Sequence, residues 1–470
     1  MEINWLDEVE KRRNQFLEDL KGLLRIESVK DPETSSPQYP MGKKVGEALD
    51  YVLNLGKSAG FTTKNLDGFA GYVEYGDSAD YIGVLAHVDV VPAPGEWTTP
   101  PFEPDIRDGK LYARGAIDDK GPGMAAFYAL KILKELGLPI QRRIRLIFGT
   151  DEESGMTCVK HYLKVEPEPA LGFSPDADFP VVHAEKGQIN VRLAVNAGNQ
   201  DDSADFILEE LSAGDRPNMV PGLAIAKIKS SDTESLINQF QAYCREQSLT
   251  GKYELLDGSH VSLTLYGKTV HGMEPEKGIN AGLECLHFLR GLAFKGDDAN
   301  FITFADEHLY RDPFGEKLGI NHREDVLGPL TVNAGIFEYH HKSGGTITLN
   351  IRRPLDIDFE KTIQTIMEKA EQYHLFIQDK KQTEPHYIPA DHPMIAALQD
   401  AYHKITGDEP TLLTSGGATY ASLMKNSVAY GAGFPGKAYT AHQIDEYAEV
   451  DDLIKATAIY AKALYDLSNL

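Results

Sequence analysis

The sequence predicts an α/β protein in which two domains share one chain, and three observations support this. At 470 residues the chain exceeds the size that a single hydrophobic core usually fills. In its first part, apolar runs typical of buried strands alternate with helical patterns. From about Gly187 onward, apolar and polar residues alternate instead, which is typical of half-exposed strands.

The first part of the chain predicts a mixed, largely parallel sheet that is covered on both faces. An amphipathic helical pattern occupies residues 1–21. Residues 81–86 and 144–148 are short, continuous apolar runs rich in β-branched side chains, which suits buried strands. Between them, Gly121-Pro122-Gly123 is expected to break the chain before a helix over residues 124–138.

The second part predicts a separate α+β unit inserted into the first. Its expected elements are strands over residues 188–195, 261–266 and 346–352, a helix over about residues 278–292, and a helix that starts within the acidic segment 356–360 and ends at about residue 373. Residues 384–389 are expected to form a loop by composition. The predicted boundaries place the first domain at residues 1–186, the inserted domain at 187–380, and the completion of the first domain at 381–470.

Composition and charge exclude several classes of function. A net charge of -24 argues against binding nucleic acid or an anionic membrane, because neutralising phosphates requires clustered Lys and Arg. No run of about 18 apolar residues is present, and residues 1–21 lack the apolar core of a signal peptide. Only three cysteines occur, without CxxC spacing, so neither a thiolate zinc site nor a disulfide framework is expected. We therefore expect a cytoplasmic protein. A monomer is favoured over a homodimer, although the sequence does not give the oligomeric state.

Five candidate metal ligands stand where strands are expected to end. Ligands of open α/β sheets gather beyond the carboxyl ends of the strands. Two imidazoles and three carboxylates form the mixed nitrogen and oxygen set that suits zinc, cobalt or manganese, and two such ions can activate one water molecule. The sequence thus predicts a two-metal hydrolase whose ligands are His87, Asp118, Glu153, Asp176 and His442.

Each of these motifs has a simpler explanation when taken alone. His87-Val88-Asp89 could be a packed core histidine with a capping acid, and Asp151-Glu152-Glu153 could be an acidic helix start. In a strand, however, positions i and i+2 share a face, so Asp89 could accept a hydrogen bond from His87 and fix its tautomer. Three adjacent acids after a buried strand also repel one another unless a cation offsets them. Together, the motifs favour the metal site.

The motifs resemble those of the M20 metallopeptidases over essentially the whole chain. More narrowly, Ser174–Pro180, Glu384–Tyr387 and Gly416–Tyr420 are similar to the bacterial dipeptidase branch of the PepV type. The resemblance implies a zinc-peptidase-like catalytic domain with two Zn²⁺ ions, for which Mn²⁺ or Co²⁺ are alternatives, and an inserted lid domain. It also implies a small peptide substrate, namely a dipeptide with a free amino terminus.

The resemblance also implies roles for individual residues. Asp118 would bridge the metals, His87 and Asp176 would complete one site, and Glu153 and His442 the other. Glu152 would be the general base. In the lid, His271 would stabilise the oxyanion of the tetrahedral intermediate. The substrate-binding positions would be Asn218, Arg352, Gly416 and Gly417.

Some alternatives stay open at this stage. On its own, His271 could be an ordinary surface histidine, Arg352 could form a surface ion pair, and Arg353 beside it blurs the assignment. Ala418, Ser422 and Asp445 depart from the usual pattern of the branch, which affects specificity more than metal binding. Other members of the family remove acyl groups from amino acids, and a free-amine requirement would separate the two activities. A binding protein without catalysis would be expected to lack Glu152, which is present.

Overall fold

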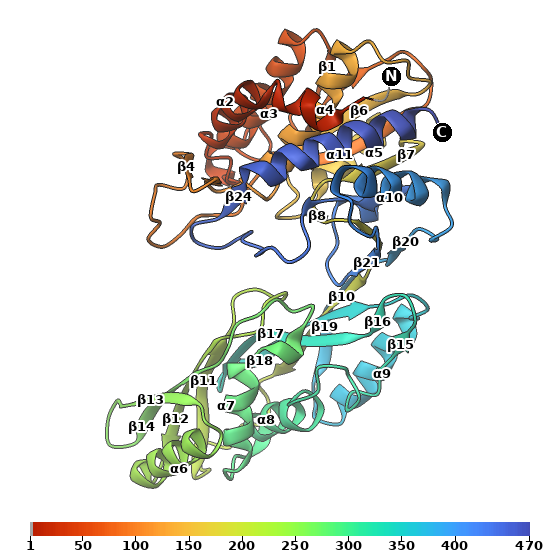
Figure 1. Cartoon of the computed structure of the whole chain (residues 1–470). Helices are drawn as coiled ribbons and strands as arrows, with labels where there is room; N and C mark the ends of the chain where they lie inside the picture. Colours follow the sequence, from red (N-terminus) through yellow and green to blue (C-terminus); the bar gives the residue numbers. More distant parts are fainter. Residues whose placement is uncertain (1–2) are drawn as a thin grey trace. The chain divides into compact units, whose positions relative to one another are not determined.

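The computed structural model describes residues 3–470, which form two compact units (Figure 1). The first unit contains the described residues up to Ala184 together with His386–Thr414 and Ala418–Leu470. The second contains Glu185–Pro385 and Ser415–Gly417, so it is inserted into the first in sequence. No helix within residues 3–470 is both long enough and apolar enough to cross a membrane. The functional roles of the two units stay a prediction.

A nine-stranded mixed sheet forms the centre of the first unit. Its order is β1-β2-β6-β3-β7-β22-β9-β20, and β21 pairs with β9. The neighbours β6, β3, β7 and β22 run parallel, whereas β1 and β2 are antiparallel additions at one edge. The strands are β1 (Thr62–Leu66), β2 (Ala70–Tyr75), β3 (Tyr81–His87), β6 (Arg143–Gly149), β7 (Leu171–Ser174), β9 (Val181–Glu185), β20 (His386–Tyr387), β21 (Leu412–Ser415) and β22 (Ser427–Ala429).

Helices cover both faces of this sheet, which explains why every residue of β3 is buried. One face carries the large apolar core with α1, α2, α3, α4, α10 and α11, and the other packs against α5 and η3. These helices are α1 (Trp5–Glu10), α2 (Arg13–Leu24), α3 (Lys43–Ser58), α4 (Lys120–Glu135), α5 (Thr157–Val165), η3 (Tyr420–Leu423), α10 (Pro393–Thr406) and α11 (Val450–Ser468). The small strands are β4 (Asp105–Arg107), β5 (Lys110–Tyr112), β8 (Ala177–Asp178), β23 (Ala432–Gly433) and β24 (Tyr447–Glu449), and η1 spans Pro32–Thr34.

The second unit is an eight-stranded antiparallel sheet with one apolar core, to which four helices contribute. The order is β13-β14-β12-β11-β17-β18-β10-β19. Its strands are β10 (Gly187–Asn196), β11 (Phe206–Ala213), β12 (Leu223–Ser230), β13 (Thr250–Leu255), β14 (His260–Tyr266), β17 (Thr331–His340), β18 (Gly344–Arg353) and β19 (Phe376–Thr383), with a separate pair β15 (Arg323–Glu324) and β16 (Gly328–Pro329). The four helices are α6 (Thr233–Glu246), α7 (Ala281–Arg290), α8 (Gly296–His308) and α9 (Phe359–Glu371), and the short 3-10 helix η2 spans Pro275–Lys277.

The predicted fold class is confirmed, and three local predictions are wrong. The helix expected over residues 124–138 begins at Lys120 and ends at Glu135. Pro122 lies in its first turn, where a missing N–H costs nothing, and Gly121 and Gly123 allow close packing on Ala116 and Ala86. The amphipathic N-terminal segment is split into α1 and α2, and the expected loop over residues 384–389 contains the short strand β20. Met1 and Glu2 lie outside the described residues.

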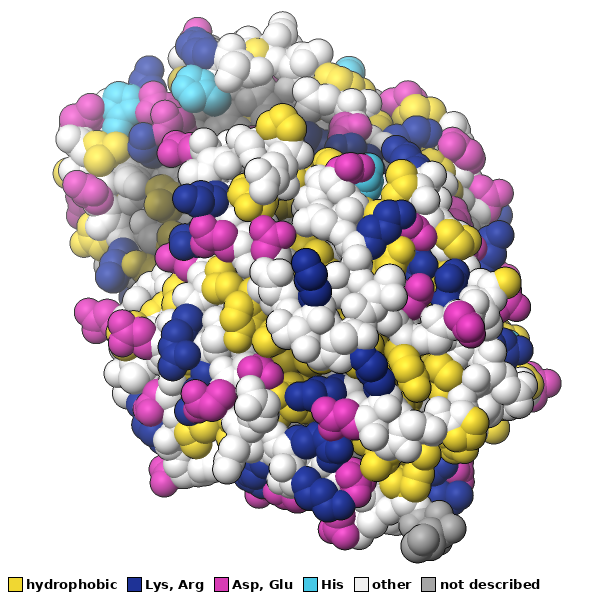
Figure 2. All heavy atoms as spheres, turned by 90° about the horizontal axis from the view of Figure 1, so that it is seen from above, with side chains coloured by type: hydrophobic (Ala, Val, Ile, Leu, Met, Phe, Trp, Pro, Cys, Tyr) yellow, Lys and Arg dark blue, Asp and Glu magenta, His cyan; other side chains and the backbone are white. Residues whose placement is uncertain are grey.

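Acidic and basic side chains are interspersed on the surface of the first unit. On the face drawn in Figure 2, Lys and Arg side chains lie among Asp and Glu rather than in one broad patch. Several ion pairs of this unit join distant segments, such as Arg12 with Glu135 at 2.7 Å and Arg13 with Asp451 at 2.5 Å. These exposed pairs contribute little to stability individually.

Candidate active site

The five predicted metal ligands come from chain segments at one edge of the central sheet of the first unit. His87 is the last residue of β3, Glu153 follows β6, and Asp176 follows β7. Because these three strands are parallel neighbours, their carboxyl ends meet at the same edge. Asp118 comes from the turn before α4, and His442 comes from the loop before β24. The expectation that the ligands stand at strand ends therefore holds for His87, Glu153 and Asp176, and it is wrong for Asp118 and His442, which lie in longer connections.

Asp118 lies between the two histidines. Its Oδ1 is 3.1 Å from His87 Nε2, and its Oδ2 is 3.1 Å from His442 Nε2. Each imidazole faces one further carboxylate: Asp176 Oδ2 at 3.7 Å from His87, and Glu153 Oε1 at 3.0 Å from His442. The two oxygens of one carboxylate thus point at two separate sets of ligands, which is the arrangement that a bridging carboxylate requires.

The tautomer of His87 leaves a lone pair for a metal ion. Its Nδ1 lies 2.9 Å from the carbonyl oxygen of Asp89 and donates to it, so Nε2 is the unprotonated nitrogen of the neutral ring. His87 Nε2 is buried and has no hydrogen-bond partner among the described residues. A buried nitrogen acceptor that faces only carboxylates fits a cation.

Asp89 acts through a different contact from the one expected. Strand β3 ends at His87, so Asp89 is not in strand geometry, and its Oδ1 is 3.5 Å from His87 Nδ1. The Asp89 carboxylate instead accepts the backbone N–H groups of Glu152 at 3.2 Å and Glu153 at 3.1 Å. The carbonyl of Asp89 therefore orients the imidazole, while its carboxylate orients the turn that carries the two glutamates.

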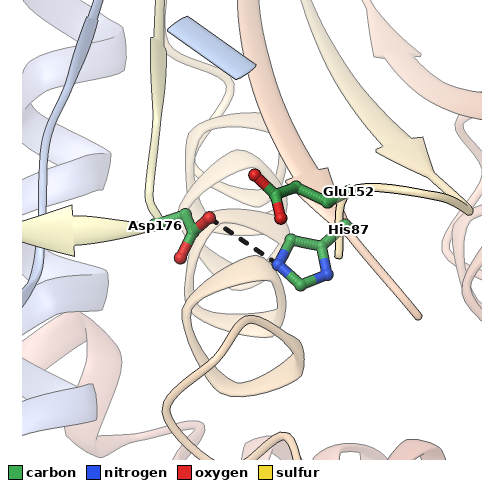
Figure 3. Close-up of side chains that lie close together, drawn as sticks. All are labelled: His87, Glu152 and Asp176. Carbon is green, nitrogen blue, oxygen red and sulfur yellow. Dashed lines mark ion pairs between the residues drawn. The ribbon is translucent and has the colours of Figure 1, made fainter. Parts of the chain in front are cut away.

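Glu152 lies among the candidate ligands. Figure 3 shows the side chains of His87, Glu152 and Asp176 directed toward one another, and their ligand atoms lie within 4.8 Å of each other. A second group with the same spacing contains His87, Asp118 and Glu153. On distance alone, Glu152 could be a ligand or a base, so its role rests on chemistry.

The crowded carboxylates shift the pKa values of the whole group. Burial raises the pKa of Glu152 well above its usual range, and the Asp176 carboxylate adds to this shift. Burial, followed by the charge of Asp118, raises the pKa of Glu153 to about 7. Burial lowers the pKa of His442, but its contacts with Asp118 and Glu153 outweigh this and raise it to about 11. Divalent cations would offset this concentrated negative charge, and the nitrogen and oxygen donors suit zinc, manganese or cobalt.

The predicted lid residues lie near one another within the second unit. The N–H of Gly272 donates to the carbonyl of Asn218 at 2.7 Å, and His271 forms a β-bridge with Met219. Arg352 Nη1 donates to the carbonyl of Gly416 at 3.1 Å. Gly416 in turn packs on Met273, where an added Cβ would lie 2.9 Å from the Met273 Cβ. The turn 271–273 therefore links the Asn218 segment to Arg352 and Gly416.

Arg352 and Arg353, which the sequence could not tell apart, have different environments. Arg353 forms an ion pair with Glu384. Arg352 is only 2% exposed, and its Nε donates to Asn350 Oδ1 at 2.9 Å. Burial lowers the pKa of Arg352 to about 10. Within residues 3–470 no carboxylate pairs with Arg352, so the alternative of a surface ion pair is wrong and the guanidinium is a candidate for binding an anion.

The Gly416-Gly417 pair is partly engaged within the second unit. The Gly417 N–H donates to Ser415 Oγ at 2.9 Å, and the Gly416 carbonyl accepts from Arg352. The Gly417 N–H is therefore not available to an anionic ligand in this conformation. This pair contributes to the candidate site mainly by holding the Arg352 guanidinium.

Three residues near the metal ligands escaped the sequence interpretation. Asp119 Oδ2 accepts the backbone N–H of His87 at 3.1 Å, and the Tyr420 ring packs edge-on against the His87 ring at 6.2 Å. Glu446 is fully buried and bonded to the Asp118 turn. Because Asp119 is next to the predicted ligand Asp118, its presence near the site can be predicted from the sequence. No local pattern indicates the partners of Glu446.

The comparisons with known proteins define the family. The model of "Peptidase family M20/M25/M40" matches residues 83–466, so the chain belongs to this peptidase family. It is 42% identical over 466 residues to "Putative dipeptidase YtjP" of Bacillus subtilis (strain 168), covering 99% of this chain and 100% of that protein. It is 40% identical to "Putative dipeptidase SH1171" of Staphylococcus haemolyticus, covering 98% and 99% of the two chains.

Solved structures show the same fold at low sequence identity. The dipeptidase Dug1p of Saccharomyces cerevisiae aligns with a TM-score of 0.61 at 15% identity, covering 99% of this chain and 98% of that one. Human carnosine dipeptidase 1 aligns with a TM-score of 0.58 at 14% identity, covering 99% and 98%. The predicted resemblance to M20 peptidases is thus confirmed.

Proposed function

We propose that this peptidase is a metal-dependent dipeptidase that hydrolyses dipeptides with a free N-terminal amine. The observation that carries this proposal is the position of Asp118, whose two oxygens face His87 and His442 at 3.1 Å each. In this proposal the first unit is the catalytic domain and the second is the lid. The names of the relatives add support for the substrate class.

The proposed ligand sets follow the contacts of Asp118. His87 and Asp176 hold one ion, Glu153 and His442 hold the other, and Asp118 bridges them. The ions are Zn²⁺, with Mn²⁺ or Co²⁺ as alternatives. When bound, such a pair lowers the pKa of a shared water molecule and polarises the scissile carbonyl.

Glu152 is the proposed general base. It takes a proton from the attacking water and gives it to the leaving amine. A carboxylate can hold a proton during turnover only if its pKa is near the operating pH, and burial raises the pKa of Glu152. Asp89 keeps this carboxylate in place through the backbone N–H groups of Glu152 and Glu153. The two adjacent glutamates thus have separate roles on one turn.

The proposed lid residues bind the substrate and its transition state. His271 donates to the oxyanion that forms on the scissile carbonyl, and Asn218 contacts the substrate. Arg352 binds the C-terminal carboxylate of the dipeptide. This last assignment is supported by a buried guanidinium whose described partners, Asn350 and Gly416, are neutral.

A panel of small substrates tests the proposed specificity. Metal-reconstituted protein is expected to cleave free dipeptides far faster than N-acetylated dipeptides or tripeptides, because the site is proposed to recognise both charged ends of a short substrate. Release of free amino acids, measured for each substrate at equal concentration, gives kcat/KM. Faster cleavage of N-acyl amino acids than of dipeptides would contradict the proposal and indicate an amidohydrolase of the same family.

A further inference from the structure

A buried glutamate joins the two loops that carry Asp118 and His442. Glu446 is 0% exposed, and its Oε2 accepts Arg114 Nη1 at 2.6 Å and the Gly115 N–H at 3.1 Å. Its Oε1 accepts the N–H groups of Ile117 at 3.0 Å and Asp118 at 3.3 Å. Four donors from residues 114–118 therefore converge on one carboxylate.

This carboxylate lies four residues after His442 in the same loop. The loop is also tied back through its main chain, because the Ala113 N–H donates to the Glu446 carbonyl at 3.1 Å. Beyond Glu446, β24 pairs with β5. The His442 side chain itself is 49% exposed, so packing around the ring does little to fix its position. The hydrogen bonds that anchor the loop therefore influence where the ring lies.

Arg114 completes the anchor. Its guanidinium is 2% exposed, donates to the Pro92 carbonyl at 3.3 Å, and lies 5.1 Å from the centre of the Trp97 ring. A buried carboxylate needs such a cation, because removing one partner leaves an uncompensated charge. Glu446 and Arg114 therefore act as one unit, which we call the Glu446–Arg114 clamp.

We propose that the Glu446–Arg114 clamp is a positioning element that sets the separation between Asp118 and His442 and so determines retention of the metal ion held with Glu153. This rests on the proposed two-metal function. The clamp touches segments that supply two of that ion's three ligands. His87 ends β3 and Asp176 follows β7, and within residues 3–470 the side-chain hydrogen bonds of Glu446 and Arg114 reach neither of them.

Glu446→Gln is the test substitution, since it keeps the shape but has one acceptor oxygen for four donors. The matched control is Asp445→Asn. It removes a charge from the adjacent residue, but its remaining oxygen can still accept from Thr98, which bonds Asp445 at 2.7 and 2.8 Å. Metal-free wild-type protein and both variants are titrated with Co²⁺, and the visible absorption and heat of each equivalent are recorded. Circular dichroism with saturating Co²⁺ reports whether each variant is folded.

For Glu446→Gln, we expect the affinity for one equivalent of Co²⁺ to fall by about 10- to 100-fold, the usual effect of losing a partner that orients a metal ligand. The affinity for the other equivalent should fall by much less, and excess metal should restore kcat. Asp445→Asn should bind both equivalents as wild type does. Two tight equivalents in Glu446→Gln, equal weakening of both, or a variant that is unfolded with saturating Co²⁺ would each overturn the proposal. Loss of peptidase activity in every protein, with the binding difference intact, would contradict the proposed function only.

Discussion

Glu152→Gln is expected to reduce kcat for dipeptide hydrolysis by roughly a thousandfold or more while both metal ions stay bound. The substitution removes the group that accepts the proton but keeps its size and the backbone N–H that Asp89 binds. The measurement combines steady-state kinetics with metal analysis of the same preparation. If the variant binds as much metal as the wild type, the loss of rate is due to the loss of a base and not to the loss of a metal ligand.

Glu153→Gln is the matched control for this prediction. Glu153 is the neighbouring glutamate on the same turn, and its Oε1 lies 3.0 Å from His442 Nε2. We expect this variant to lose one equivalent of metal along with activity. If Glu152→Gln loses metal instead and Glu153→Gln retains it, the two roles are exchanged. The close group of His87, Glu152 and Asp176 makes this comparison informative.

Arg352→Ala is expected to lower kcat/KM for dipeptides by roughly a hundredfold, which corresponds to losing a charge-assisted hydrogen-bonded pair. The reason is that the substrate carboxylate would then be desolvated without a partner. A dipeptide amide has no carboxylate, so its kcat/KM should fall much less. The double ratio of kcat/KM values, for two substrates and two proteins, isolates the interaction.

Arg353→Ala provides the control for Arg352→Ala. Arg353 is the adjacent cation, but its charge is already paired with Glu384, whose side chain is 70% exposed. We expect its removal to change both substrates by a similar small factor. If Arg352→Ala lowers kcat/KM equally for the dipeptide and for the dipeptide amide, this residue does not bind the substrate carboxylate. Arg353 or the Gly416 backbone would then become the better candidate.

The sequence predicted the strands in which nearly every residue is buried. The apolar runs at residues 81–86 and 144–148 form β3 and β6, because strands covered on both faces need apolar side chains at every position. Their parallel pairing brings His87 and Glu153 to one edge, so the strand ends predicted where these two candidate ligands lie. The start of α4 differs from the prediction because Gly121-Pro122-Gly123 lies in the first turn of the helix, where Pro is tolerated, and so does not break the chain.

Contacts that depend on long-range packing could not be predicted. The sequence predicted that Asp89 and His87 share one face of a strand. Strand β3 ends at His87, however, and the Asp89 carboxylate accepts the backbone N–H of Glu152. The distinction between Arg352 and Arg353 depends on Glu384, which reaches only one of them. The four donors to Glu446 come from residues more than 300 positions earlier. No local pattern encodes these choices.

The central claim is that two metal ions held around Asp118 are required for dipeptide hydrolysis. The most direct test is to titrate metal-free protein with Zn²⁺ or Mn²⁺ while dipeptide turnover and bound metal are measured together. Turnover should rise with metal, saturate at about two bound equivalents per chain, and disappear when a chelator removes the ions. Full turnover by protein that contains no bound metal, or saturation at one equivalent, would contradict the two-metal account.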